Sequence, residues 1–343
     1  MGESENIMSS QFSRRSFLST GAKVAGTAAL AGLVPSFLDA APASAASLKS
    51  MAYQLSWVKD AEFAGTFLAD KMGFYKKHGL SVNILAGGAS VVPEPVVVSG
   101  KCLVASSAAD ACAQAIAQGA PLKIIGVRYQ KNPYCIISLA KSPIKTPQDL
   151  YGKKLGVSAA NEVPWQTFVK ITGIDASKIN VVPVQFDPTP LATGDVDAWM
   201  GFITSEPGQL QVKGVKIRTW LFADFGYAVY SDLYEVTEET LNTKEEELVS
   251  FMKAEKQGWT YNFANINKGT TTAMSYAKSS GLQKSQQLLE NTAQKALIET
   301  PYTKAHGLFT MDPKDIEDNI KTLAQGGIKA TAAMFSDKIV KQI

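Results

Sequence analysis

The stretch MAYQLSWVKDAEFAGTFLADKMGFYKKHGLSVNIL, residues 51–85, predicts a strand, a helix and a second strand. Met51–Trp57 alternates apolar and polar side chains as a half-buried strand does, whereas 62–77 repeats apolar residues at helical spacing. Gly79 stands at the position of a helix C-cap, directly before the strand Ser81–Leu85. A helix between consecutive strands predicts parallel pairing with a right-handed crossover, and therefore an α/β fold.

The same alternation continues through the rest of the chain. Before residue 140 it predicts further strands at 103–105 and 123–128, separated by a helix at 108–118. A second cycle begins near residue 142, and its strands are expected at 154–157, 180–184, 197–202 and 216–220. After residue 237 the pattern becomes helical.

We therefore expect two doubly wound α/β lobes joined by a hinge, with a ligand cleft between them. The expected first lobe comprises residues 46–140 plus 228–343, and the second comprises 141–227. Sheets of this kind bind ligands at the carboxyl ends of their strands, and paired lobes close on a small molecule by bending at the hinge.

Arg14 and Arg15 precede an apolar segment that has the features of an export leader. Residues 22–38 are too short and too interrupted by glycine and proline to span a bilayer comfortably, and small residues follow at cleavage spacing. A pair of arginines ahead of such a segment is the signal for export by the twin-arginine route. We expect residues 1–45 to be a twin-arginine signal peptide and the mature protein to be periplasmic or extracytoplasmic; the alternative is a basic tail.

Composition argues against several classes of function. The net charge is +3 and the sequence has no basic run, so it predicts no positively charged surface for binding nucleic acid. Cys102, Cys112 and Cys135 lack metal-ligand spacing, so we expect buried thiols, with a Cys102–Cys112 bridge as the alternative. His78 and His306 are the only histidines, and the motifs HExxH, GxSxG and GxGxxG are absent. We expect no catalytic set, no metal, no cofactor and a monomeric mature protein.

Several segments together resemble one family of exported proteins. They are LSWVKDAEFAG (55–65), KMGFYKKHGL (71–80), the pair Gly87–Gly88, DVDAWMGFITSEP (195–207) and FGYAVYSD (225–232). The chain resembles substrate-binding proteins of the thiamine-pyrimidine-precursor type, which are related to nitrate, sulfonate and taurine binders and include riboflavin binders. The resemblance implies a periplasmic binding protein fold of type II. It also implies delivery of a small planar heterocycle to the permease and ATPase subunits of an ABC importer.

One branch of this family contains self-consuming pyrimidine synthases that carry a CCCFC segment. That segment is absent from this chain. We therefore expect a binding protein, with riboflavin, another aromatic compound or a sulfonate as alternative ligands and a secreted enzyme as the least favoured alternative.

Trp57 and Glu206 are the main candidates for ligand contact. Trp57 ends the first predicted strand, where its ring can stack on a flat heterocycle, an interaction typically worth about 1–3 kcal/mol. The resemblance implies that Glu206 contacts the pyrimidine. A carboxylate accepts two N–H bonds from a ring nitrogen and its exocyclic amine, whereas it repels sulfonate or nitrate.

Further candidates occupy the turns that follow the predicted strands. Asp60 is expected either at the ligand or as a helix cap, and Phe63 either at the ligand or in the core. Gly88 and Ser90 form a turn that could instead hold an anion, although no lysine or arginine lies in it. The remaining candidates for the cleft are Ala64, Ser106, Ser107, Asn161, Trp165, Phe186 and Tyr227.

Overall fold

The computed structural model describes residues 47–277 and 281–343. The predicted leader, residues 1–45, lies outside the described residues. Residues 46–343 form one unit by their internal contacts. Within the described residues, no helix is both long enough and apolar enough to cross a membrane.

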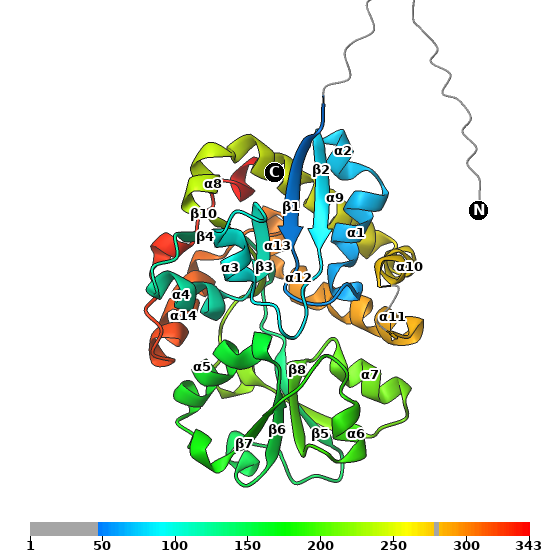
Figure 1. Cartoon of the computed structure of the whole chain (residues 1–343), viewed down its shortest axis with the longest axis vertical. Helices are drawn as coiled ribbons and strands as arrows, with labels where there is room; N and C mark the ends of the chain where they lie inside the picture. The colour runs from blue at the N-terminus through cyan, green and yellow to red at the C-terminus, as the bar shows by residue number, and fades with distance from the viewer. Residues whose placement is uncertain (1–46, 278–280) are drawn as a thin grey trace, which may run out of the picture. The chain divides into compact units, whose positions relative to one another are not determined.

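The first lobe is built on a five-stranded sheet in the order β2-β1-β3-β10-β4 (Figure 1). β1 runs parallel to both β2 and β3, with Lys49 opposite Leu80 at the start of the first pairing. β10 runs antiparallel to β3 and β4. The strands are β1 (Lys49–Gln54), β2 (Leu80–Leu85), β3 (Val104–Ser107), β4 (Leu122–Tyr129) and β10 (Ser231–Thr237).

The second lobe repeats this arrangement in the order β7-β6-β8-β5-β9. β6 pairs parallel to β7 and β8, while β5 runs antiparallel to β8 and β9. The strands are β5 (Tyr134–Leu139), β6 (Lys154–Val157), β7 (Asn180–Pro183), β8 (Ala198–Phe202) and β9 (Ile217–Leu221). The prediction of two α/β lobes is confirmed.

The predicted parallel pairing of strands joined by a helix is confirmed for β1 with β2 and for β6 with β7. Each sheet also contains one antiparallel strand that the sequence analysis did not predict. β5 and β10 are the first strands after each crossing between the lobes, and each enters its sheet from the opposite direction. The second sheet therefore begins at Tyr134, earlier in the chain than the boundary at residue 141 that we expected.

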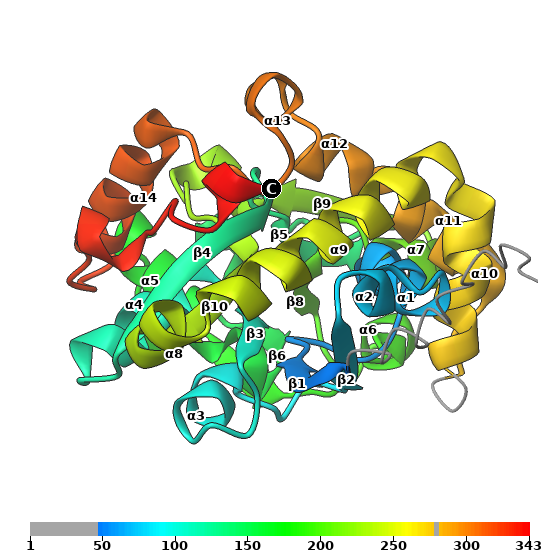
Figure 2. The same ribbon diagram turned by 90° about the horizontal axis from the view of Figure 1, so that it is seen from above.

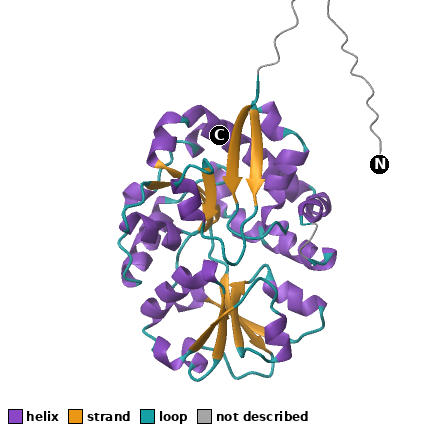
Figure 3. Ribbon diagram, in the orientation of Figure 1, coloured by secondary structure: helices purple, strands orange, loops and turns teal. Residues whose placement is uncertain are grey.

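Helices cover both sheets (Figure 3). The segment predicted as one helix at 62–77 is divided, because Gly73 adopts a left-handed φ of 73° between α1 and α2. The helices before the return crossing are α1 (Ala64–Lys71), α2 (Phe74–Lys77), α3 (Pro93–Val98), α4 (Ala109–Ala117), α5 (Glu162–Thr172), α6 (Thr189–Thr193) and α7 (Glu206–Val212).

The C-terminal part is helical, as its pattern predicts. Its helices are α8 (Glu238–Thr243), α9 (Glu245–Ala264), α10 (Ile266–Tyr276), α11 (Lys284–Ala293), α12 (Lys295–Ile298), α13 (Pro301–His306) and α14 (Pro313–Gln325). Short 3₁₀ helices are η1 (Ala61–Phe63), η2 (Pro147–Leu150), η3 (Ala159–Asn161), η4 (Ala176–Lys178), η5 (Phe222–Phe225), η6 (Ala332–Met334) and η7 (Val340–Gln342).

α9 packs against the first lobe through two glycines. Figure 2 shows α9 lying across this lobe beside α1 and α2. A Cβ atom at Gly65 of α1 would overlap the indole of Trp259, and one at Gly258 would overlap the Gly65 carbonyl. Because glycine has no side chain, α1 and α9 can come into direct contact at these two positions. This contact holds the segment that leads from β1 into α1.

The three cysteines are free and buried, so the prediction of buried thiols is confirmed and the Cys102–Cys112 bridge does not form.

Candidate functional site

A cavity of about 610 Å³ is lined by residues of both lobes. Its polar end is formed by Ser56, Trp57, Glu62, Glu206 and Asp232. Ser56 and Trp57 follow β1, and Glu206 follows β8, so the carboxyl ends of strands supply this end of the cavity. The site therefore lies where parallel strands of an α/β protein are expected to bind a ligand.

Four side chains that line the cavity are of types that are charged at neutral pH in water, and all four are acids. They are Glu62, Glu94, Glu206 and Asp232, and no lysine, arginine or histidine of the described chain joins them. Carboxyl groups accept hydrogen bonds from N–H donors when ionised. The cavity is therefore suited to a ligand that carries amine or ring N–H donors.

Glu206 begins α7 and turns back over the end of β8. Its Oε2 accepts the N–H of Phe202 at 2.9 Å, and a Cβ at Gly201 would lie only 2.5 Å from the same oxygen. Burial raises the pKa of Glu206 to about 7, although hydrogen bonds from Phe202 and Trp199 oppose the shift. Glu206 is thus poised to lose its proton when a donor approaches.

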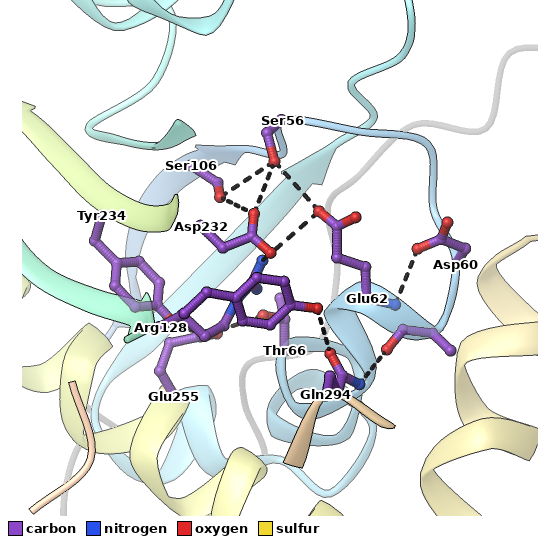
Figure 4. Close-up of polar contacts among 12 residues, drawn as sticks. Ser56, Asp60, Glu62, Thr66, Ser106, Arg128, Asp232, Tyr234, Glu255 and Gln294 are labelled. Carbon is purple, nitrogen blue, oxygen red and sulfur yellow. Dashed lines mark hydrogen bonds and ion pairs between the residues drawn. The ribbon is translucent and has the colours of Figure 1, made fainter. Parts of the chain in front are cut away.

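A buried arginine forms the floor beneath the polar end (Figure 4). Arg128 of β4 is fully buried, and its Nη2 lies 2.9 Å from Oδ2 of Asp232 and 3.8 Å from Oε1 of Glu62. Its guanidinium also lies over the rings of Phe63 and Trp259, at 4.6 and 5.2 Å from their centroids. The arginine is therefore paired with Asp232 and does not line the cavity, while its Nε and Nη1 have no hydrogen-bond partner among the described residues.

Two serines connect this ion pair to the cavity surface. The Oγ of Ser56 donates to Oδ1 of Asp232 at 3.3 Å and lies 3.3 Å from Oγ of Ser106. Asp232 has a positive φ of 49°, an uncommon conformation for a residue other than glycine. Such strain persists only where the surroundings fix it, and it is concentrated at functional sites.

Three buried acids gather behind the polar end. One carboxyl oxygen from each of Asp60, Glu62 and Glu290 lies within 4.8 Å of the others, which makes this the candidate cation site of the described chain. Burial, reinforced by neighbouring carboxylates, raises the pKa of Asp60 to about 8 and those of Glu62 and Glu290 well above their usual range. These shifts favour the protonated, uncharged form of the three acids at neutral pH.

α11 holds this acidic cluster in place with buried amides. Gln287 and Gln294 bind the backbone of Ala61, one accepting its N–H at 2.5 Å and the other donating to its carbonyl at 2.8 Å. Oε2 of Glu290 accepts from the side-chain amides of Gln286 and Gln287, both at 2.9 Å. The loop that carries Asp60 and Glu62 is therefore clamped from behind.

The structure brings four of the sequence-predicted site residues to the cavity wall: Trp57, Ser107, Asn161 and Glu206. Ser106 lies just behind the wall through its bond to Ser56. Asp60 does not reach the cavity and instead accepts the N–H of Glu62 at 3.0 Å, which is the capping role that we gave as its alternative.

The other candidates lie outside the cavity wall, for reasons of packing. Phe63 supports Arg128, and Ala64 is buried at the start of α1. Trp165 is buried against Phe168, and the hydroxyl of Tyr227 donates to buried Asp110. Gly88, Ser90 and Phe186 also do not line the cavity.

Sequence reasoning missed Ser56, Glu62, Glu94, Tyr134 and Asp232, all of which line the cavity. Glu62 had a readable signal, because it lies in the turn beside Asp60. Asp232 had none, since its place depends on the antiparallel pairing of β10.

Comparisons with known proteins agree with this architecture. Residues 60–288 match the family model described as NMT1/THI5 like. A protein of Haemophilus influenzae named for thiamine biosynthesis is 26% identical over 232 residues, which cover 66% of this chain and 74% of the relative. Riboflavin-binding protein RibY of Chloroflexus aurantiacus is 22% identical over 247 residues, which cover 69% of each chain.

The periplasmic aliphatic sulphonate binding protein SsuA of Escherichia coli is similar in three dimensions. It superposes with a TM-score of 0.60 at 14% identity, over 87% of this chain and 92% of that one. The likeness shows that the fold is that of periplasmic binding proteins.

Proposed function

The chain belongs to the NMT1/THI5-like family, and on that premise we propose that it is an exported solute-binding protein for a small planar heterocycle that bears amine donors. The ligand class is that of the pyrimidine precursors of thiamine. The protein delivers this ligand to an ABC importer outside the cytoplasm, and its leader uses the twin-arginine route.

The acidic lining of the cavity carries this proposal. Glu62, Glu94, Glu206 and Asp232 line a space that no cationic side chain of the described residues lines, and the nearby Arg128 is already paired with Asp232. A sulfonate or nitrate ion would meet carboxyl groups and no compensating positive charge. An aminopyrimidine would instead offer N–H donors, which the ionised form of Glu206 accepts.

The two lobes make complementary contributions in this proposal. Trp57 of the first lobe supplies a half-exposed ring for stacking, and Glu206 of the second supplies the acceptor. A ligand that engages both groups stabilises the closed arrangement of the lobes, because it binds that arrangement more tightly.

A catalytic role receives no support from the described residues. The CCCFC segment of the related synthases is absent, and the ionisable groups at the cavity are acids and Tyr134 alone. We propose a binding function without a chemical step.

A thermal-shift screen tests the ligand class. We expect 4-amino-5-hydroxymethyl-2-methylpyrimidine to raise the Tm of the purified protein, with a shift that grows with ligand concentration as linkage requires. Riboflavin, taurine and nitrate serve as comparison ligands. Stabilisation by taurine or nitrate alone would contradict the proposal, and stabilisation by riboflavin alone would replace the pyrimidine with a flavin.

A further inference from the structure

Apolar side chains form part of the cavity lining, which we call the apolar arm and define as Val92, Pro95, Val98, Ala111, Ala115 and Val163. On α4, cavity-lining residues recur at 111, 114, 115 and 118, which places them on one face of the helix and its C-cap. α3 and the residue before it supply the opposite wall. Val163 of α5 belongs to the second lobe, so both lobes contribute to the arm.

Charge is almost absent from this part of the cavity. Glu94 is its one acid among the described residues, and that side chain is only 4% exposed and hydrogen-bonded to the Oγ of Ser107. The polar groups near the arm also include the amides of Gln114 and Gln118 on the α4 side and of Asn161 beside Val163. The arm therefore differs in chemistry from the polar end, where Glu62, Glu206 and Asp232 gather.

The apolar arm leaves large aliphatic side chains in contact with solvent. Val92 and Val98 are 49% and 43% exposed. Both valines line the cavity, so a ligand that fills the arm covers them. Each Å² of apolar surface removed from water contributes roughly 25 cal/mol, so covering these side chains favours binding.

We propose that the ligand carries an apolar substituent, aliphatic or aromatic, which occupies the apolar arm while its heterocycle occupies the polar end. The placement of the heterocycle rests on the proposed function, whereas the arm can be tested without it. Both parts belong to one cavity of about 610 Å³. This volume lies within the range of sites that enclose drug-sized ligands. The cavity therefore has room for a ligand larger than a single substituted ring.

Three probes separate the arm from the polar end. They are 4-amino-2-methylpyrimidine, its 5-benzyl derivative, and the neutral apolar dye N-phenyl-1-naphthylamine. We expect the benzyl derivative to bind about ten- to a hundredfold more tightly than the bare ring, because burial of a phenyl group contributes that much. We expect the dye to bind in the arm and to be displaced by the benzyl derivative.

The variant Ala115→Phe fills the arm and should remove the advantage of the benzyl derivative and the binding of the dye. Ala117→Phe is the matched control, because Ala117 is exposed at the end of the same helix and does not line the cavity. Should Ala115→Phe fail to fold, the double variant Val92→Thr and Val98→Thr keeps the volume but makes the wall polar. It should weaken dye binding several-fold.

The outcomes distinguish the two proposals. Dye binding that Ala115→Phe abolishes, without any binding of the pyrimidines, would support the arm and contradict the proposed heterocycle. If the two pyrimidines bind with equal affinity and Ala115→Phe does not change this, the proposal that the arm holds a substituent is overturned. The proposal that the polar end binds a heterocycle would still stand. Light scattering could instead detect a dimer that Ala115→Phe dissociates. The arm would then be a contact between two copies of the chain, and the proposal would also be overturned.

Discussion

At the scale of single residues, the proposed function makes Glu206 the acceptor for the ligand's N–H donors. Its pKa of about 7 in the free protein results from burial, so part of the population carries a proton at neutral pH. An N–H donor binds the ionised carboxylate, which lowers the pKa in the complex. Affinity for 4-amino-5-hydroxymethyl-2-methylpyrimidine should therefore rise as the pH increases from about 5.5 to 7 and level off above it, because binding must expel this proton below pH 7.

Glu206→Gln mimics the protonated acid and keeps an oxygen that can accept the N–H of Phe202. We expect it to weaken binding by about tenfold or more at pH 8 and to abolish the rise of affinity with pH, since a charge-assisted bond is lost. Isothermal titration calorimetry across this range measures both effects. The control is Glu162→Gln, an exposed acid at the start of α5 that does not line the cavity. Equal effects of the two substitutions would refute the role of Glu206.

The residues at the polar end of the cavity differed in how well their positions could be predicted from the sequence. Trp57 ends one predicted strand and Glu206 follows another, and the family resemblance, not the local pattern alone, placed both at the cleft. The pair of Arg128 and Asp232 could not be predicted, because it joins β4 to β10 through an antiparallel register. Trp165 shows the opposite error, since a tryptophan beside a predicted turn belongs to the core.

At the scale of elements, the contact between α1 and α9 depends on Gly65. Gly65→Ala would place a Cβ atom inside the indole of Trp259, which itself lies beneath Arg128. Overpacking of this kind costs about 1–3 kcal/mol of the free energy of unfolding, which outweighs the gain of about 1 kcal/mol in helix propensity. Urea denaturation should show the lower stability.

Gly208→Ala provides the matched comparison in α7. Its nearest neighbour would be Cγ of Gln286 at 3.7 Å, an ordinary contact, so the substitution should be neutral or stabilising. If both alanines changed stability equally, helix propensity and not packing on Trp259 would explain the result.

Elements with a local signature were predicted well, and those that depend on distant pairing were missed. Eight strands were expected close to their observed positions, from β1 to β4 and from β6 to β9. β5 and β10 were missed, and burial alone does not explain this, because β4 is almost as fully buried and was predicted. Their positions follow from the crossing between lobes, which no local pattern specifies.

At the scale of the whole molecule, the buried acids couple folding to pH. Burial raises the pKa of Asp60 to about 8, of Asp110 to about 6 and of Glu206 to about 7 in the folded protein. Unfolding returns these groups to their ordinary values near 4, so the folded state binds more protons between pH 4 and 8. Stability is consequently greatest at the acidic end of this range and falls as the pH rises through the folded-state values.

We therefore expect the urea midpoint of the ligand-free protein to decrease from pH 5.5 to pH 8. Asp60→Asn should flatten this dependence, because asparagine stays neutral and still caps η1 through an acceptor for the N–H of Glu62. A midpoint that increases over the same range would show that these acids are ionised in the folded state. An amine-bearing ligand should oppose the decrease, since its donors stabilise the ionised Glu206 that an empty cavity destabilises.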